Sequence, residues 1–518
     1  MPPAFLPRNT TTATSGLPLS ARLPRILVAL AVGLLLLSTY QRIVQIDEAW
    51  IGEQAYWAAR DGIVRSELFR GFLHAEVRQL VYHKLFVWQA AGLIRLAGWS
   101  VTGLRLLSLA YLGLFVVLSG RYLRTLPLRP RSSWLYFALL LSNTLIAEFS
   151  FTFRPEIMLM TLGFASWQCL QLASRSSRRR WYVAGAGLLA GLATLTHLNG
   201  LIFVAAGSVL LLWRRQVAAV AIFAGPVVLC AGCYFLEVGL LDAWAEFWRQ
   251  LQPAVQQADA GGWLYVRRLL QEHKRLFHSF KEASLSGGTL LAAVVLYWQR
   301  TSFAPVWLSE LVVYTLVLMA ALAVISQNDN SFYTILYIPF LVLLITVALN
   351  QLASPNGWVT WVARAAVGVY LLLNFGGTLY LTSRHHDVMG EHRRLGRHLA
   401  SYRGATVVAP LKFVYNELEQ FNIQGTFCYY LMAAAKPDVP FDFFAQAARF
   451  QRQLLLLDDE SLKTLHLPRP STGQHFGAYR FSHRFGEFYI YTRTPHAASP
   501  GTPAAPSPAA ASTKPAPR

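Results

Sequence analysis

The sequence predicts a mostly α-helical, polytopic membrane bundle followed by a small α/β domain. Of its 518 residues, 54% are hydrophobic and only 14% are charged, whereas soluble proteins carry roughly 25% charged residues. The apolar residues gather in long runs, several of which approach the roughly 20 residues that a helix needs to cross a bilayer. Beyond residue 381 these runs stop, and short helical and strand patterns alternate, which is typical of an α/β domain.

About eleven apolar runs between residues 26 and 381 are predicted to be membrane spans, and residues 1–25 are expected to form a cytoplasmic segment before them. Tyr182–Thr196 and Leu198–Trp213 nearly meet at His197, which predicts a close helical hairpin with this histidine at its turn. The full set is Ile26–Tyr40, Leu104–Leu123, Trp134–Phe149, Ile157–Ala173, Tyr182–Thr196, Leu198–Trp213, Val217–Leu236, Leu285–Trp298, Val306–Ile325, Phe332–Leu349 and Val359–Leu381.

The segment Leu80–Gly98 decides the predicted topology. It is apolar enough to be a span, yet it contains His83, Lys84 and Arg95. If it lies in the membrane interface, the arginines between residues 121 and 131 share the N-terminal side with the other basic breaks. Positive residues gather on the cytoplasmic side, so an interfacial helix is predicted, with the N-terminus inside and the C-terminus outside. The expected location is the inner (plasma) membrane of a bacterium, with multiple spans.

This topology places the unusual polar segments on the outer side. The first outer loop, residues 41–103, contains Ile46-Asp47-Glu48-Ala49-Trp50, which sets two adjacent carboxylates at the mouth of the first span. Such a pair is costly there unless it faces water or binds a partner. Arg154-Pro155-Glu156, His197 and Gln327-Asn328-Asp329-Asn330 fall on the same side.

A second outer loop, residues 237–283, carries an amphipathic pattern. Trp263–Phe280 alternates aromatic and aliphatic residues with basic ones, among them Arg267 and Arg268. This pattern is typical of a helix that lies on a membrane surface rich in anionic groups.

The polar C-terminal part, residues 385–494, is predicted to be an extracytoplasmic α/β domain. Asp458-Asp459-Glu460 follows a predicted strand and is interpreted as a helix start rather than a metal site. The tail at 495–518, rich in Pro, Ala, Ser and Thr, is predicted to be disordered. The expected elements are a helix at Val388–Tyr402, a strand at Ala405–Ala409, a helix at Phe413–Phe421, a strand at Gly425–Tyr430, a helix at Phe441–Phe450, a strand at Gln453–Leu457 and a hairpin around Gly486.

Charge and cysteine content exclude two other functions. The formal net charge of +20 would suit a nucleic-acid-binding protein, but the basic residues lie mainly in short breaks between apolar runs, so no nucleic-acid partner is expected. Cys230 and Cys233 have the spacing of a redox motif, but they fall in an apolar run, where small residues three apart favour helix packing.

The order and common sidedness of these motifs resemble the membrane-embedded C-type glycosyltransferases, nearest the branch that contains the protein O-mannosyltransferases and the lipid A aminoarabinose transferases. The similarity covers roughly residues 25–381. The motifs that carry it are the acidic pair of the first outer loop, Gly103-Leu104-Arg105-Leu106-Leu107-Ser108, Arg154-Pro155-Glu156, the glycine-rich hairpin that ends at Thr196-His197, and Phe332-Tyr333 followed by Tyr337-Ile338-Pro339.

The resemblance implies transfer of a sugar from a polyprenyl-phosphate donor to an acceptor on the outer side of the membrane. It assigns Asp47 to the catalytic acid of the first loop, Glu48 to the partner carboxylate, Glu156 to the second acidic position and Arg105 to the arginine near the lipid phosphate. The chain departs from the family in the first loop, where His74-Ala75-Glu76-Val77-Arg78 replaces a His-Pro-Pro-like stretch. It also carries His197 where relatives often have Lys or Arg, and no Lys or Arg precedes Tyr333.

The residue types suit this chemistry. Glycosyl transfer passes through an oxocarbenium-like state and needs a carboxylate to deprotonate the acceptor, which is the role expected of Asp47 as general base. The leaving phosphate needs cationic stabilisation, for which Arg105, Arg154 or the Arg267/Arg268 pair are candidates. His197 and Tyr333 are further candidates for substrate contacts.

The sequence leaves the metal open, because adjacent acids either bind a divalent cation or act as a base and its partner. The expected partners are the lipid-linked sugar donor, a glycan, lipid or protein acceptor, and membrane lipids. The alternatives are a transporter or flippase for a lipid-linked or small polar substrate and a non-catalytic envelope assembly protein. Transporters place charges near the bilayer midplane and often contain inverted repeats, whereas the charges here lie at one face.

Overall fold

The structure is a computed structural model that describes residues 19–256, 264–298, 306–326, 330–352, 357–435 and 438–494. The chain divides into two compact units. The first contains residues 1–398 and 411–419, and the second contains residues 399–410 and 420–518. The predicted cytoplasmic segment up to residue 18, the tail from residue 495, Trp263 and the stretch 327–329 lie outside the described residues.

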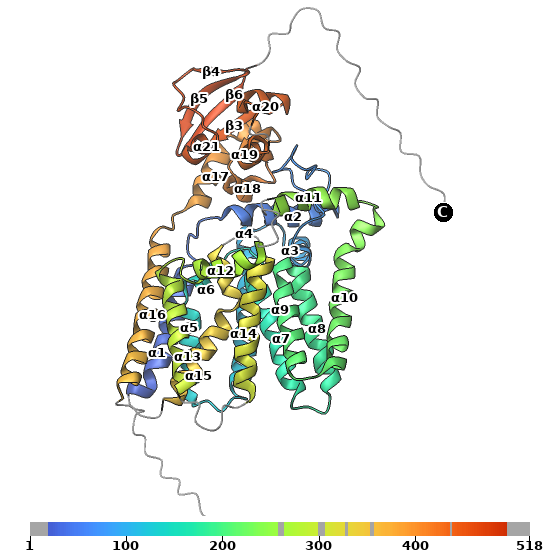
Figure 1. Cartoon of the computed structure of the whole chain (residues 1–518). Helices are drawn as coiled ribbons and strands as arrows, with labels where there is room; N and C mark the ends of the chain where they lie inside the picture. Colours follow the sequence, from blue (N-terminus) through green and yellow to red (C-terminus); the bar gives the residue numbers. More distant parts are fainter. Residues whose placement is uncertain are drawn as a thin grey trace, which may run out of the picture. The chain divides into compact units, whose positions relative to one another are not determined.

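The first unit is a bundle of helices (Figure 1). Every predicted apolar run contains helix, as the patterning predicted. The bundle helices are α1 (Leu19–Leu37), α4 (Val101–Leu123), α5 (Pro130–Ser142), α6 (Thr144–Ser150), α7 (Glu156–Ala173), α8 (Arg179–Thr196), α9 (Leu201–Trp213), α10 (Val217–Leu240), α13 (Phe280–Trp298), α14 (Val306–Ile325), α15 (Ile338–Gln351) and α16 (Trp358–Ser383).

Three predicted runs are each divided into two elements. Leu198–Trp213 begins as the 3₁₀ helix η1 (Leu198–Gly200) and continues as α9. Asn143 separates α5 from α6, and its side chain caps α6 by accepting hydrogen bonds from the backbone N–H of Leu145 and Ile146. The run at 332–349 begins as the 3₁₀ helix η2 (Ser331–Leu336) and continues as α15, with Pro339 in the first turn, where its missing N–H costs no hydrogen bond.

Within the described residues, four helices are long and apolar enough to cross a membrane: α4, α10, α14 and the helix that begins at Trp358. This indicates a multi-pass membrane protein. The count of eleven spans stays a prediction, since several bundle helices are shorter or less apolar than these four.

Glycines allow α8 to pack closely against α10, beside α7 and α9 (Figure 1). A Cβ at Gly187 would lie 2.0 Å from the carbonyl oxygen of Phe223, and a Cβ at Gly191 would lie 2.9 Å from Cys230. Small residues four apart are a common device for such close contacts in membranes. Cys230 is therefore buried in this contact as a free thiol, and Cys233 is free and exposed, in agreement with the helix-packing interpretation.

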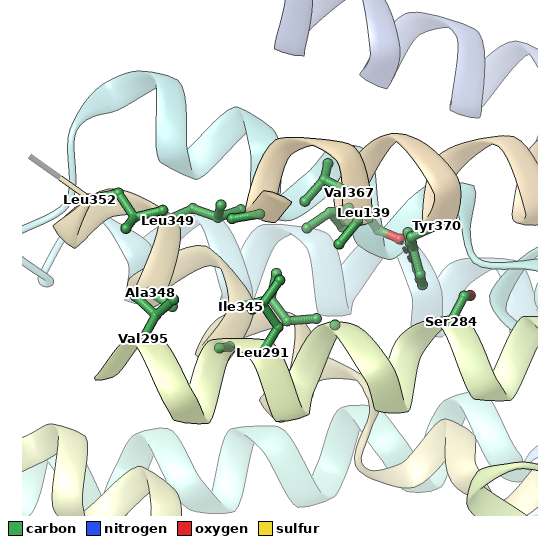
Figure 2. Close-up of a pocket in the computed structure, with 14 residues that line it drawn as sticks. Leu139, Ser284, Leu291, Val295, Ile345, Ala348, Leu349, Leu352, Val367 and Tyr370 are labelled. Carbon is green, nitrogen blue, oxygen red and sulfur yellow. Dashed lines mark hydrogen bonds between the residues drawn. The ribbon is translucent and has the colours of Figure 1, made fainter. Parts of the chain in front are cut away.

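A narrow apolar crevice lies among α5, α13, α15 and α16. Figure 2 shows Leu139, Ile345, Val367 and Tyr370 around it. The crevice contains none of the predicted site residues.

Amphipathic and polar helices occupy both predicted outer loops: α2 (Ile46–Asp61) and α3 (Lys84–Ala97) in the first, α11 (Trp244–Gln256) and α12 (Leu264–Leu276) in the second. The segment Leu80–Gly98 is helical from Lys84, and its interfacial placement stays a prediction. Two further helices of the first unit follow α16: α17 (Val388–His398) and α18 (Leu411–Glu417).

The second unit is built on a six-stranded mixed sheet with strand order β2-β1-β3-β6-β5-β4. β1 is parallel to β2 and β3, with Val407 opposite Ile423 and Leu454, and the remaining pairs are antiparallel. Its elements are η3 (Ala400–Tyr402), β1 (Thr406–Ala409), β2 (Asn422–Gly425), α19 (Thr426–Ala434), α20 (Phe443–Arg449), β3 (Leu454–Leu457), α21 (Asp459–Thr464), β4 (His475–Phe476), β5 (Tyr479–Phe485) and β6 (Phe488–Arg493).

Most of the elements predicted for this part are confirmed, with one correction. The carboxylate of Asp458 accepts a hydrogen bond from the N–H of Ser461 and so begins α21, as interpreted. The strand predicted at Gly425–Tyr430 is wrong, because the strand ends at Gly425 and residues 426–434 form α19. Short aromatic runs fit helix and strand equally well, and here the run Thr426–Tyr430 packs as a helix through buried Cys428 and Tyr429.

Candidate active site

The two carboxylates of the acidic pair lie in the first turn of α2 and have opposite environments. The backbone N–H of Gln45 donates to Oε2 of Glu48 at 2.9 Å, which caps the helix. The Glu48 side chain is fully buried, whereas that of Asp47 is 47% exposed. Of the pair, Asp47 is therefore the one that a substrate can reach.

Glu48 forms a buried clamp with Arg105 of α4. Nε and Nη2 of Arg105 donate to the two Glu48 oxygens at 2.9 and 2.8 Å, and the backbone N–H of Phe153 donates to Oε1 at 2.7 Å. Arg105 also donates to the carbonyls of Arg42 and Ile43 at 3.1 Å. The clamp joins α2, α4 and the segment before α7, and this geometry favours a positioning role over the predicted phosphate contact of Arg105.

Arg154 bridges the remaining two acids. Its Nη2 lies 2.6 Å from Oε1 of Glu156, and its Nη1 pairs with Oδ2 of Asp47. The guanidinium is sandwiched near the rings of Phe149 and Phe332, whose centroids lie 5.2 and 4.7 Å away. Glu156 is 1% exposed at the start of α7, so Arg154 links a buried acid to the half-exposed Asp47.

Two histidines and a tyrosine lie beside the group formed by Asp47, Arg154 and Glu156. The rings of His83 and His197 stack with centroids 4.8 Å apart, and the hydroxyl of Tyr333 lies 3.5 Å from Nε2 of His197. Asp47, Arg154 and Glu156 all interact electrostatically with His83 and with Tyr333. Burial lowers the pKa of His83 to about 4 and that of His197 well below its usual value, so both rings are neutral near pH 7.

The amphipathic helix α12 contributes a different arginine from the predicted pair. Arg267 is exposed and Arg268 half-exposed. Arg275 is buried, pairs with Glu272 at 2.7 Å and interacts electrostatically with Tyr333. Glu272 in turn accepts a hydrogen bond from the hydroxyl of Tyr337 at 3.3 Å. Arg275 is thus an α12 cation that interacts electrostatically with Tyr333 of the site.

A further buried carboxylate, Glu53, organises the chain after α2. It accepts hydrogen bonds from the Ser66 hydroxyl at 2.5 Å, from the Trp57 indole at 2.8 Å and from the backbone of Glu67 at 2.6 Å. Burial raises the pKa of Glu53 to about 7, although these donors oppose the shift. Glu53 therefore fixes the start of the loop that leads to His83.

The C-terminal end of that loop, residues 78–84, forms ion pairs with α10 and hydrogen bonds with α11. Glu237 at the end of α10 pairs with Arg78 and with Lys84, both at 3.0 Å. Gln250 of α11 accepts from the N–H of Leu80 and donates to the carbonyl of Arg78, each at 2.8 Å. These bonds place His83, which lies directly before Lys84, against His197.

Of the nine residues predicted for the site, the structure brings Asp47, Arg154, Glu156, His197 and Tyr333 together. Glu48 and Arg105 form the buried clamp behind Asp47, whereas Arg267 is exposed and Arg268 half-exposed on α12. His83, Arg275 and Glu53 were missed. A signal for His83 was its position beside Lys84 inside an otherwise apolar segment, whereas nothing local distinguishes Arg275 from its basic neighbours.

The described part of the chain contains no group of three or more His, Cys, Asp or Glu side chains arranged to hold a metal ion. Of the adjacent acids that the sequence offered for a divalent cation, Glu48 pairs with Arg105 and Asp47 pairs with Arg154. Each carboxylate is therefore bound to an arginine in this arrangement.

No protein-family model and no curated protein sequence matches the chain, but solved structures do. ArnT from Cupriavidus metallidurans bound to undecaprenyl phosphate is 15% identical, with a TM-score of 0.58 over 92% of this chain and 99% of that chain. The same protein in the apo state gives 15% identity and a TM-score of 0.56 over 90% and 97% of the two chains.

The archaeal oligosaccharyltransferase AglB from Archaeoglobus fulgidus, in complex with an inhibitory peptide and a dolichol-phosphate, is 12% identical. Its TM-score is 0.50 over 85% of this chain and 70% of that chain. At these identities the likeness is one of fold. The fold predicted from the resemblance, that of the membrane-embedded C-type glycosyltransferases, is confirmed.

Proposed function

We propose that this chain is an integral-membrane glycosyltransferase that moves a sugar from a polyprenyl-phosphate donor to an acceptor on the outer face of the membrane. The observation that carries the proposal is the half-exposed carboxylate of Asp47, bound by Arg154 and backed by the buried Glu48–Arg105 clamp. A rigidly supported carboxylate that remains accessible is what a general base for an incoming nucleophile requires.

The reaction assigns a role to each group. Asp47 takes the proton of the acceptor nucleophile, whose oxygen or nitrogen then bonds to the anomeric carbon. The bond between that carbon and the phosphate oxygen breaks, and its electron pair leaves with the lipid phosphate. Arg154 and the buried Glu156 keep Asp47 in place.

The leaving phosphate needs hydrogen-bond donors and positive charge. His197 and Tyr333 present an N–H and an O–H to the site, and Arg154 and Arg275 are the cations that act electrostatically on Tyr333, alongside the acids Glu156 and Asp47. The solved relatives support a lipid-linked donor, because ArnT was solved bound to undecaprenyl phosphate and AglB in complex with a dolichol-phosphate. The acceptor is a glycan, a lipid or a protein; AglB is described with a peptide.

The membrane arrangement follows the sequence prediction. We propose about eleven spans, a cytoplasmic N-terminus, and an active site and α/β unit outside the cytoplasm in the inner (plasma) membrane of a bacterium. The α/β unit is assigned to recognition of the acceptor or of a partner, since Asp47, Arg154, Glu156, His83, His197 and Tyr333 all belong to the first unit.

The direct test is transfer by the purified protein in nanodiscs, using polyprenyl-phosphate sugars labelled in the sugar and membrane extracts as the acceptor source. If the protein transfers the sugar, labelled product and free polyprenyl phosphate should form in equal amounts. With the protein reconstituted in closed vesicles, a transporter or flippase would move the labelled lipid across the bilayer with the sugar–phosphate bond intact, and that result would overturn the proposal.

A further inference from the structure

The α/β unit contains a polar groove at one end of its sheet, where β1 and β3 begin and β6 ends. The backbone N–H of Gln453 donates to the carbonyl of Thr406 at 2.9 Å, and that of Arg493 donates to the carbonyl of Gln453 at 3.0 Å. These bonds place the three strand ends side by side. The turn at residues 402–405, which leads into β1, completes the groove.

Two arginines line the groove, and no acidic residue of the described chain does. Arg403 is exposed and Arg493 is half-exposed, and neither forms an ion pair with a residue that the structure describes. The tail that follows Thr494 contains no Asp or Glu. The groove therefore presents two cationic groups without a paired carboxylate, and the planar fork of an arginine suits the oxygens of a phosphate or a carboxylate.

A tight turn holds the backbone of Arg403 in position. Gly404 has a φ of 78°, a left-handed conformation that glycine adopts without a steric penalty. The N–H of Ala405 closes the turn by donating to the carbonyl of Tyr402 at 2.9 Å, and the N–H of Gly404 donates to the carbonyl of Gln420 at 2.8 Å. The backbone at Arg403 is thus ordered before a ligand binds, which lowers the entropic cost of binding.

Neutral polar groups surround the two arginines. The amide oxygen Oε1 of Gln453 accepts a hydrogen bond from the N–H of Thr406 at 3.2 Å, so the amide NH₂ of Gln453 is the end that is left for a ligand. Hydroxyl groups of Ser401, Thr492 and Thr494 also line the groove. A hydroxyl group both donates and accepts hydrogen bonds, so these side chains match the hydroxyl groups of a sugar.

The backbone of the groove is already hydrogen-bonded. The N–H groups of residues 402–406, 453, 493 and 494 all donate to acceptors within the α/β unit. A peptide that binds by adding a strand to a sheet needs unpaired backbone groups. Recognition in the groove therefore depends on side chains, which favours a glycan with an acidic group over a peptide.

We propose that this groove is an anion site that binds the phosphate or carboxylate group of an acidic glycan acceptor. Arg403 and Arg493 bind the anion, and the neutral groups bind adjacent sugar hydroxyls. The inference rests on the proposed function, which assigns the α/β unit to recognition of the acceptor or of a partner, and it narrows the acceptor to one chemical class.

The first test measures binding of small acidic sugars to the full-length protein in phosphatidylcholine nanodiscs. The probes are glucose 6-phosphate and glucuronate, and the references are glucose, inorganic phosphate and glycerophosphoglycerol, the soluble form of a lipid headgroup. An exposed charge pair contributes up to about fivefold in affinity. With two arginines, at least one acidic sugar should bind roughly tenfold more tightly than glucose, and also more tightly than inorganic phosphate or glycerophosphoglycerol. Arg403→Gln/Arg493→Gln should lose this preference, and Arg449→Gln, at an exposed arginine of α20, should keep it.

The second test asks whether the groove serves the acceptor. In the transfer assay with membrane extract, the double variant Arg403→Gln/Arg493→Gln should need roughly tenfold more extract than wild type for half-maximal transfer, because its acceptor affinity is lower. Its Kd for a polyprenyl phosphodiester should stay at the wild-type value, and Arg449→Gln should need the same amount of extract as wild type.

Several results would overturn the inference. A preference for acidic sugars that is absent in wild type, or that survives in the double variant, would show that the groove is no anion site. Binding of inorganic phosphate or glycerophosphoglycerol as tight as that of the acidic sugars would exclude recognition of a glycan. An unchanged need for extract in the double variant would separate the groove from the acceptor. If the wild-type protein transfers no sugar, the proposed function and the assignment to an acceptor both fail, whereas the binding measurements still decide whether the groove holds an anion.

Discussion

Replacing Glu48 by glutamine separates a positioning role from a substrate-binding role for the Glu48–Arg105 clamp. The Glu48 side chain is fully buried and that of Arg105 is 3% exposed. Loss of one partner of a buried ion pair costs about 3–5 kcal/mol, because the other charge stays buried without compensation. Arg105 retains two backbone carbonyl acceptors, so we expect the lower end of this range, about 3 kcal/mol, in the free energy of unfolding.

The assay is thermal unfolding of the protein in nanodiscs, together with the Kd for a polyprenyl phosphodiester. Glu48→Gln and Arg105→Gln should both unfold at clearly lower temperature, and the double variant Glu48→Gln/Arg105→Met should recover part of the loss, because no unpaired charge remains. If Arg105→Gln kept wild-type stability and lost donor affinity, Arg105 would be a phosphate ligand, as the family resemblance implied, and the clamp reasoning would be refuted.

Three further perturbations test the surrounding structure. Burial raises the pKa of Glu53 to about 7, so Glu53 stabilises the folded state below pH 4.5, and this stabilisation is lost as the pH rises to about 7. The melting temperature of Glu53→Gln should therefore decline less over this pH range than that of wild type. An identical decline would contradict the raised pKa of Glu53. Arg154→Lys keeps the charge but cannot bridge Asp47 and Glu156 through a planar fork, so turnover should fall roughly tenfold or more in a transfer assay, and wild-type turnover would show that bridging is unnecessary. In a cysteine-free background, single cysteines at Arg129 and Ser177 should be shielded from an impermeant thiol reagent in intact cells and one at Lys274 should be labelled; labelling at Arg129 would refute an interfacial α3 and the eleven-span topology.

Apolar patterning predicted the helices well, because a run of hydrophobic residues is a local property. The division of Trp134–Phe149 was not predictable in this way. It depends on the Asn143 amide donating to the hydroxyl of Tyr370, which is far away in the sequence. The strand predicted at Gly425–Tyr430 failed for a related reason, since the packing of Cys428 and Tyr429 selects a helix that the local pattern leaves ambiguous.

In the candidate site, too, residues could be predicted from their local sequence, whereas contacts between distant segments could not. The sequence identified Asp47, Arg154 and Glu156 as unusual because each is an acid or base beside a membrane span. Only the family resemblance distinguished Asp47 from Glu48, since the physical difference between them lies in the burial of Glu48 by Arg105 and by the backbone of Phe153. His83 joins the site through its stack with His197, a contact between segments that no local pattern connects.

The most direct measurement of the central claim is the turnover of Asp47→Asn beside Asp61→Asn, a matched control at the last residue of the same helix, α2. The substitution preserves volume and hydrogen bonding at Asp47 but removes the base. Turnover with a polyprenyl-phosphate sugar should fall by roughly 10²–10⁴ with little change in the Kd for the donor, the usual effect of losing a positioned general base. The control should transfer sugar at the wild-type rate. A purified Asp47→Asn protein with normal turnover would show that this carboxylate is not the base and would contradict the proposed mechanism.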